Sequence, residues 1–125
     1  MFTNARVFSS FAVDDVDKAK EFYGETLGMN VSENRGMGIL ELHSGDQEIL
    51  VYPKPDFVPA TYTILNFSVA DIDKAVDELA TRGVRFERYD GFDTDEKGIS
   101  RDDGGPPIAW FEDPAGNILA VLEAE

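Results

Sequence analysis

The only histidine of this 125-residue chain, His43, follows Glu41 by two residues. Residues two apart on a β-strand project from the same face, so we expect the imidazole and the carboxylate to lie side by side. Such a pair can begin a metal site or act as an acid–base couple. The sequence places no third nitrogen or carboxylate ligand nearby, so a hydrated sheet face beside a turn is the simpler interpretation.

Four aspartates carry carboxylates at positions that predict a structural role. They occur in two copies of one pattern, VDDVDKA from residue 13 and VADIDKA from residue 69. Asp15 and Asp71 stand where a helix N-cap belongs and can accept hydrogen bonds from free backbone N–H groups. Asp17 and Asp73 fall in the first turn, where a negative charge interacts favourably with the helix dipole. We therefore interpret all four as structural rather than catalytic.

The composition excludes several classes of partner and cofactor. Eleven basic against 25 acidic residues give a net charge of −14, which disfavours phosphate backbones and anionic membrane surfaces. The absence of cysteine excludes disulfides and cysteine-type zinc sites. No apolar run is long enough to span a membrane, and the first residues do not have the layout of a signal peptide. We expect a cytoplasmic protein without nucleic-acid or membrane partners.

The repeated pattern opens two modules with the same predicted element order. Strands over 7–13 and 62–69 precede two helices, which end at Gly28 and Gly83. Three further strands follow each helix, at 29–33, 37–42 and 48–52, and at 84–89, 108–112 and 118–122. The copies are offset by 56 residues at the capping aspartates and by 55 at these glycines, so one gap aligns them.

This order predicts an α+β fold, with two βαβββ modules forming a curved mixed sheet. We expect a single domain over 1–125, with module one at 1–53, a proline-rich linker at 53–60 and module two at 61–125. A four-stranded half leaves an apolar face and unpaired edges that a second half must cover. Whether the modules pair within one chain or between two chains stays open.

A family resemblance rests on these modules and on three short motifs. The motifs are the V-x-D-hydrophobic-D-K-A opening, F-Y followed by L-G-M in the first module, and D-P-x-G-N-x-L in the second. Over nearly its whole length the chain resembles the vicinal oxygen chelate superfamily. That superfamily includes glyoxalase I, extradiol dioxygenases, fosfomycin-resistance enzymes and bleomycin-resistance proteins. One activity does not follow, because the fold carries several unrelated functions.

In similar family members one metal ion is held by up to four side chains from the first and last strands of the modules. The resemblance places those positions at Phe8, Leu50, Ile64 and Ala120. None of these side chains has a lone pair to donate, whereas Zn²⁺, Fe²⁺ and Mn²⁺ need several nitrogen, oxygen or sulfur ligands. We therefore expect no metal at the family site and no cofactor.

The polar segment 90–107 and two aromatic residues are further candidates for ligand binding. A stretch of this length without apolar periodicity is typical of a lid or binding loop. Within it, Arg101 can hold an anionic group over a pocket or pair with nearby acids. Trp110, on the strand 108–112, and Tyr52, at the end of 48–52, fit either the core or a pocket wall.

Three functions follow from these observations. In the first, an apolar pocket binds a small organic ligand without metal, through Phe8, Leu50, Tyr52, Ile64, Arg101, Trp110 and Ala120. This is similar to the bleomycin-resistance branch, whose acidic, metal-free members bind a cationic drug at a dimer interface. The second is a glyoxalase-type lyase or isomerase, or a dioxygenase-like enzyme. The lack of metal-binding side chains at the four family positions argues against it. The third is a scaffold with a filled pocket, although Ala120 leaves room. The resemblance also implies a homodimer.

Overall fold

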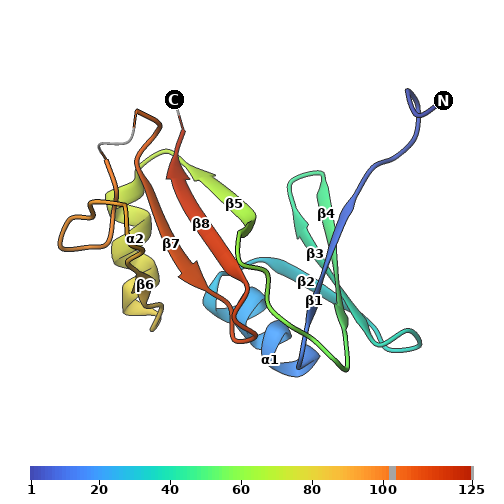
Figure 1. Cartoon of the computed structure of the whole chain (residues 1–125). Coiled ribbons are helices and arrows are strands. Elements are labelled where there is room, and N and C mark those ends of the chain that lie inside the picture. The colour runs from blue at the N-terminus through green and yellow to red at the C-terminus, as the bar shows by residue number, and fades with distance from the viewer. Residues whose placement is uncertain (102–103, 125) are drawn as a thin grey trace. The chain divides into compact units, whose positions relative to one another are not determined.

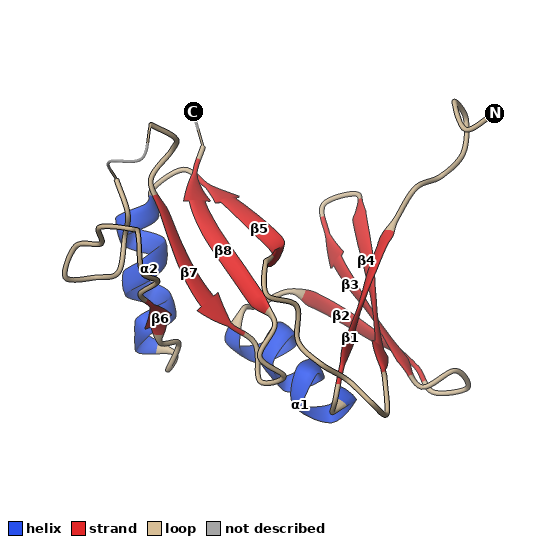
Figure 2. Ribbon diagram, in the orientation of Figure 1, coloured by secondary structure: helices blue, strands red, loops and turns tan. Residues whose placement is uncertain are grey.

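The computed structural model describes residues 1–101 and 104–124 of the chain (Figure 1). The chain forms two compact units, Met1–Val58 and Pro59–Glu125, and the boundary falls inside the predicted linker. Each unit has its own four-stranded sheet and its own helix, and is described here by itself (Figure 2). No helix within the described ranges combines the length and apolarity needed to cross a bilayer.

Unit 1 contains a mixed sheet, called sheet 1. Its elements are β1 (Ser9–Val13), α1 (Val16–Glu21), η1 (Phe22–Thr26), β2 (Asn30–Asn34), β3 (Ile39–Ser44) and β4 (Gln47–Pro53). The strand order is β1-β4-β3-β2, with β1 parallel to β4 and the other pairs antiparallel. The parallel pair places β1 next to the last strand of its own unit.

Unit 2 repeats this topology in sheet 2. Its elements are β5 (Thr63–Val69), α2 (Ile72–Thr81), β6 (Phe86–Glu87), β7 (Ile108–Glu112) and β8 (Ile118–Glu123). The order is β5-β8-β7-β6, again with one parallel pair, β5 with β8. The two βαβββ modules and the α+β class predicted from the sequence are therefore confirmed.

The largest difference from the predicted strands is in unit 2, while β1 begins at Ser9 rather than at residue 7. The expected strand 84–89 is reduced to β6, in which Phe86 and Glu87 pair with Phe111 and Trp110. The next residue, Arg88, turns its guanidinium to the backbone carbonyls of residues 95 and 96 and to the hydroxyl of residue 94. The ladder ends there because the chain folds back on this side chain.

The repeated aspartates cap both helices as predicted. An Asp15 carboxylate oxygen accepts from the backbone N–H of Lys18 at 3.1 Å, and Asp71 does the same with Lys74 at 3.1 Å. Caps of this kind stabilise a helix by about 1 kcal/mol each. Gly28 has φ 72° and Gly83 has φ 91°, which is the left-handed conformation expected after a helix end.

The first helix contains a wide turn that the second helix lacks. The N–H of Leu27 donates to the carbonyl of Phe22 at 2.9 Å, a five-residue step that defines the π-helical segment η1. The distance along the chain from the capping aspartate to the glycine is one residue longer in this copy. A π turn accommodates one extra residue, so η1 accounts for the gap needed to align the two copies.

In each unit the helix packs against one face of that unit's own sheet. In sheet 1 the Phe11 ring lies 5.7 Å from the Tyr23 ring, which places Phe11 and its register neighbours Val51 and Leu40 on the helix side. In sheet 2 the buried residues Ala109, Phe111, Leu119 and Val121 form the corresponding face. The opposite surfaces are called the helix-distal faces.

Candidate functional site

A row of four cross-strand neighbours crosses the helix-distal face of sheet 2. The strand register aligns Asn66 with Ala120, Ala120 with Trp110, and Trp110 with Glu87. Side chains directly opposite one another project from the same face of a sheet. Two of the predicted binding residues, Trp110 and Ala120, are therefore brought together.

Two more aromatic rings surround Trp110. The Tyr89 ring lies edge-on at 5.8 Å between centroids, and the Phe92 ring lies at 4.8 Å with an interplanar angle of 58°. Trp110 and Tyr89 are half-buried and Phe92 is exposed. The three rings form a continuous aromatic surface at the edge of sheet 2, close to β6.

Two carboxylates flank this surface. Glu87 lies opposite Trp110, and Glu112 follows Trp110 by two residues and so shares its face. The Glu112 side chain as a whole is exposed, but desolvation of its carboxyl group raises its pKa, and the charges of Glu87 and Asp113 raise it further. The net effect of these surroundings is a raised pKa for Glu112. The carboxylates of Glu87 and Glu112 therefore make this surface electrically negative.

The hydroxyl group of Tyr89 is a buried donor without a hydrogen-bond partner among the described residues. Burial raises the pKa of Tyr89, and the negative charges of Glu112 and Glu87 act in the same direction. A buried hydroxyl without an acceptor carries a free-energy cost in the folded protein. Glu87, Tyr89, Phe92, Trp110 and Glu112 are called the aromatic–carboxylate cluster.

Arg101, a candidate either for ligand contact or for local ion pairing, lies on the side of α2. Its guanidinium donates to both carboxylate oxygens of Asp73, at 2.9 and 3.0 Å, and to Asp95 at 3.3 Å. Lys97 pairs with Asp73 at 3.4 Å and with Asp77 at 3.1 Å. This is the local ion pairing that the sequence offered as an alternative. A contact between Arg101 and a ligand stays a prediction.

The described part of the 90–107 segment pairs with β7 through its backbone, and the Asp95 carboxylate holds the segment together internally. Ser100 and Ile108 exchange two backbone hydrogen bonds, at 2.8 and 3.0 Å. Burial acts to raise the pKa of Asp95, but hydrogen bonds from the N–H groups of Ile99 and Lys97, together with Arg101, outweigh it and lower that pKa. Residues 102 and 103 lie outside the described residues.

The other predicted binding residues belong to separate places. Leu50 and Tyr52 share the helix-distal face of sheet 1, and Tyr52 is 39% exposed. Phe8 directly precedes β1, is 48% exposed, and lies under the Arg6 guanidinium at 4.8 Å. Ile64 lies at an irregularity in the pairing of β5 with β8. The seven predicted residues thus form a sheet 1 group, a sheet 2 group and the α2-side Arg101.

Glu41 and His43 lie side by side on the helix-distal face of sheet 1, as the strand spacing predicted. Glu41 Oε1 lies 3.8 Å from His43 Nε2. The structure adds Ser32, which the sequence did not single out, from the neighbouring strand β2. The Ser32 hydroxyl donates to Glu41 Oε1 at 3.0 Å and lies 3.1 Å from His43 Nε2.

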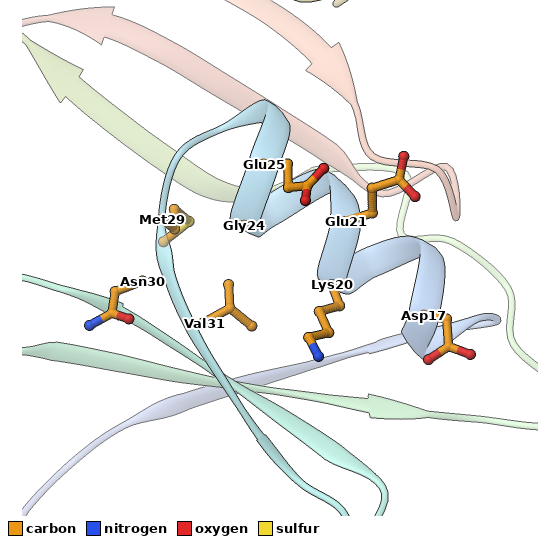
Figure 3. Close-up of a pocket in the computed structure, with 8 residues that line it drawn as sticks. All are labelled: Asp17, Lys20, Glu21, Gly24, Glu25, Met29, Asn30 and Val31. Atoms are coloured by element: carbon orange, nitrogen blue, oxygen red, sulfur yellow. The ribbon is translucent and has the colours of Figure 1, made fainter.

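An open hollow of about 480 Å³ lies on unit 1 between the first helix and β2 (Figure 3). It is lined by Asp17, Lys20, Glu21, Gly24, Glu25, Met29, Asn30 and Val31. Lys20 forms an ion pair with Glu33 at 2.9 Å, and Figure 3 shows that the three carboxylates of the lining do not converge on one point. The hollow contains none of the seven predicted binding residues, and we assign it no ligand.

The four family metal positions do not fit a metal ion. Phe8, Leu50, Ile64 and Ala120 present only carbon atoms, and Ala120 is fully buried. Within residues 1–101 and 104–124, no group of three or more His, Asp or Glu side chains is placed to bind an ion. Chemistry that depends on a metal at these four positions has no ligands to support it.

Comparison with known proteins identifies the family. The model of the Glyoxalase/Bleomycin resistance protein/Dioxygenase superfamily matches residues 7–121. The chain belongs to this superfamily, as the sequence motifs predicted. The protein YurT of Bacillus subtilis (strain 168) is 31% identical, over 94% of this chain and 97% of YurT.

Solved structures of different function share the fold. TnmS3, an antibiotic binding protein from Streptomyces sp. CB03234, is 24% identical with a TM-score of 0.71, over 98% of this chain and 99% of that chain. Lactoylglutathione lyase from Agrobacterium tumefaciens is 21% identical with a TM-score of 0.67, over 98% of this chain and 96% of that chain. At these identities the likeness establishes the fold alone.

Proposed function

We propose that this chain is a small-molecule-binding protein of the glyoxalase/bleomycin-resistance type, which binds an organic ligand without a metal at the four family positions. The observation that carries the proposal is the chemistry of Phe8, Leu50, Ile64 and Ala120, whose side chains offer apolar contact and no lone pairs. Apolar walls with a few placed polar groups are typical of small-molecule sites.

The aromatic–carboxylate cluster on sheet 2 has the most specific chemistry among the candidate binding residues. A cation over the faces of Trp110 and Tyr89 gains a cation–π interaction, worth about 0.5–2 kcal/mol depending on its desolvation. Desolvation is the main cause of the raised pKa of Glu112, and the same cation reduces the repulsion from Glu87 that raises this pKa further. We infer that the ligand is an organic cation with a flat apolar part.

The fold neighbours are consistent with binding and with catalysis. TnmS3 binds an antibiotic by its description, and the Agrobacterium protein is a lyase by its name. We favour binding, because the four positions lack the donors that metal-dependent catalysis requires. We also propose a homodimer in solution, which sedimentation equilibrium at micromolar concentration tests, and a monomer there contradicts it.

Thermal unfolding with three matched probes tests the binding proposal. The probes are a planar aromatic amine that is cationic at neutral pH, its uncharged isostere and an aromatic carboxylate of similar size. A ligand that binds the native state raises the unfolding temperature. We expect the cation to give the largest shift, and an excess of EDTA to leave that shift unchanged. Loss of the shift with EDTA would contradict metal independence.

Charge-neutral variants test the location of the site. Glu112→Gln and Glu87→Gln keep the side-chain shape and remove one negative charge each, and Glu25→Gln on unit 1 removes the same charge far along the chain. We expect the first two to weaken cation binding about tenfold or more and the third to leave it unchanged. Equal effects of all three variants would show attraction by net charge alone.

A further inference from the structure

Ser32, Glu41 and His43 form a compact group of donors on the helix-distal face of sheet 1. Ser32 is paired with Glu41 in the register of β2 and β3, and Asn30 is paired with His43. The three side chains therefore come from two adjacent strands, whose geometry fixes their separation. None of the three is one of the four family positions, although Glu41 lies directly opposite Leu50 in the register of β3 and β4.

The three donor atoms are arranged as one face of a coordination polyhedron. Ser32 Oγ lies 3.0 Å from Glu41 Oε1 and 3.1 Å from His43 Nε2, and these last two atoms are 3.8 Å apart. Three atoms at these separations lie on a circle of radius about 1.9 Å, while metal–nitrogen and metal–oxygen bonds of Zn²⁺ are about 2.0–2.2 Å. A point at bonding distance from all three atoms therefore exists just above their plane.

The chemistry of the donors selects the kind of ion. Imidazole suits Zn²⁺, Cu²⁺, Ni²⁺ and Fe²⁺, and a carboxylate adds charge compensation. The hydroxyl of Ser32 is a weaker ligand that completes the face. The His43 and Glu41 side chains are 34% and 33% exposed, so an ion can reach them and keep its other coordination positions for water or a small ligand.

The geometry points to a site for a divalent first-row transition-metal ion at Ser32, Glu41 and His43. Binding replaces the hydrogen bonds of Ser32 with Glu41 and His43 by three bonds to the ion. It requires an unprotonated imidazole, so acidification weakens it. The ion bound here is additional to the ligand-binding site of sheet 2 and does not use the four family positions.

Titration of tag-free protein with Zn²⁺ tests this site directly, because the imidazole proton signals of the only histidine can be followed by NMR without any variant. We expect the His43 signals to shift to completion with one equivalent of Zn²⁺, and Co²⁺ to give a visible absorption spectrum of nitrogen and oxygen ligation. Unchanged imidazole signals at one equivalent would overturn the proposal.

Variants separate the site from diffuse attraction of cations by an acidic protein. His43→Asn leaves the charge of the neutral form unchanged, and we expect it to weaken Zn²⁺ binding at least tenfold in calorimetric titration. Glu41→Gln and Glu33→Gln each remove one negative charge, but Glu33 is one residue from Ser32 and projects from the opposite face. We expect a tenfold loss for Glu41→Gln and little change for Glu33→Gln. Equal affinities for wild type and His43→Asn would rule the site out.

Discussion

Ala120 lies directly opposite Trp110 in the ladder of β7 and β8, and its methyl group is fully buried. The small side chain at this position adds little bulk beside the tryptophan ring, whose other neighbours are Tyr89 and Phe92. In the resemblance to the vicinal oxygen chelate superfamily, this position corresponds to a metal ligand. In this chain the same position instead adjoins the aromatic–carboxylate cluster.

The first prediction concerns the space beside Trp110. Ala120→Leu adds bulk to a packed face, so we expect a loss of about 1–3 kcal/mol in the free energy of unfolding and loss of ligand binding. Ala109→Leu is the matched control, because Ala109 is equally buried in the same ladder but projects from the helix side. We expect a similar loss of stability there, with ligand affinity retained in folded protein at low temperature.

The second prediction concerns the raised pKa of Glu112. Because its folded pKa lies above its unfolded value, the ionised carboxylate destabilises the fold at neutral pH, and this cost disappears as the pH falls below the unfolded value. We expect Glu112→Gln to increase stability to urea at pH 7 while weakening cation binding. A decrease in stability at pH 7 would show that Glu112 is engaged in a favourable interaction.

The third prediction concerns two glycines with the same backbone conformation. Gly91 and Gly98 both have φ of 90°, but a Cβ on Gly98 would lie 2.9 Å from Cβ of Phe86, whereas one on Gly91 would meet nothing within 4 Å. Alanine at Gly91 should cost about 1–2 kcal/mol through the left-handed backbone alone. Alanine at Gly98 should cost about 1–3 kcal/mol more, through the added contact. Urea unfolding of both variants measures the difference.

The fourth prediction concerns the turn between β7 and β8. The buried carboxylate of Asp113 accepts from the backbone N–H groups of Ala115 and Asn117 and from the Asn117 side-chain amide, at 2.9–3.0 Å. Asp113→Ala leaves these donors without that acceptor, so we expect a loss of about 3 kcal/mol in unfolding free energy. Asp113→Asn keeps one acceptor oxygen and should lose less. Equal losses would show that packing, not hydrogen bonding, sets the cost.

The fifth prediction concerns the attachment of the segment after β6 to α2. Hydrogen bonds from Arg101 lower the pKa of Asp73, burial opposes this, and Lys97 adds to the lowering. A lowered folded pKa means that the ionised form stabilises the fold. This contribution is complete above the unfolded pKa and is lost as the pH falls through the folded value. We expect the stability difference between wild type and Asp73→Asn to shrink between about pH 5 and pH 2.

Much of the fold could be predicted because local signals agree with tertiary structure. The strand 108–112 was predicted with the bounds of β7, and Asp15 and Asp71 were predicted as the caps that they form. The wide turn η1 was not predicted. The sequence shows that the first copy has one extra residue, but not whether a helical turn or the following loop takes it up. A strand was predicted at 84–89, but its early end was not. The strand ends after Glu87 because the Arg88 guanidinium binds the following loop, a contact that the sequence does not indicate.

The candidate site could be predicted only in part, because its members meet through strand register. Trp110 and Ala120 were each named, but their position opposite one another depends on the pairing of β7 with β8. Phe92 was missed because it is an isolated aromatic residue in a polar segment. Tyr89 was missed because its contact with Trp110 depends on how the chain folds after β6. Ser32 was missed because nothing local to β2 indicates that it faces Glu41.

The π turn at Phe22–Thr26 also bears on how the two halves of the chain can be compared. The first copy has one more residue between the capping aspartate and the glycine than the second copy, yet the same strand order follows in both halves. Widening a single turn absorbs this residue locally. The strands after the helix therefore still correspond, β2 with β6, β3 with β7 and β4 with β8, so substitutions in the paired parts of these strands can be exchanged between halves.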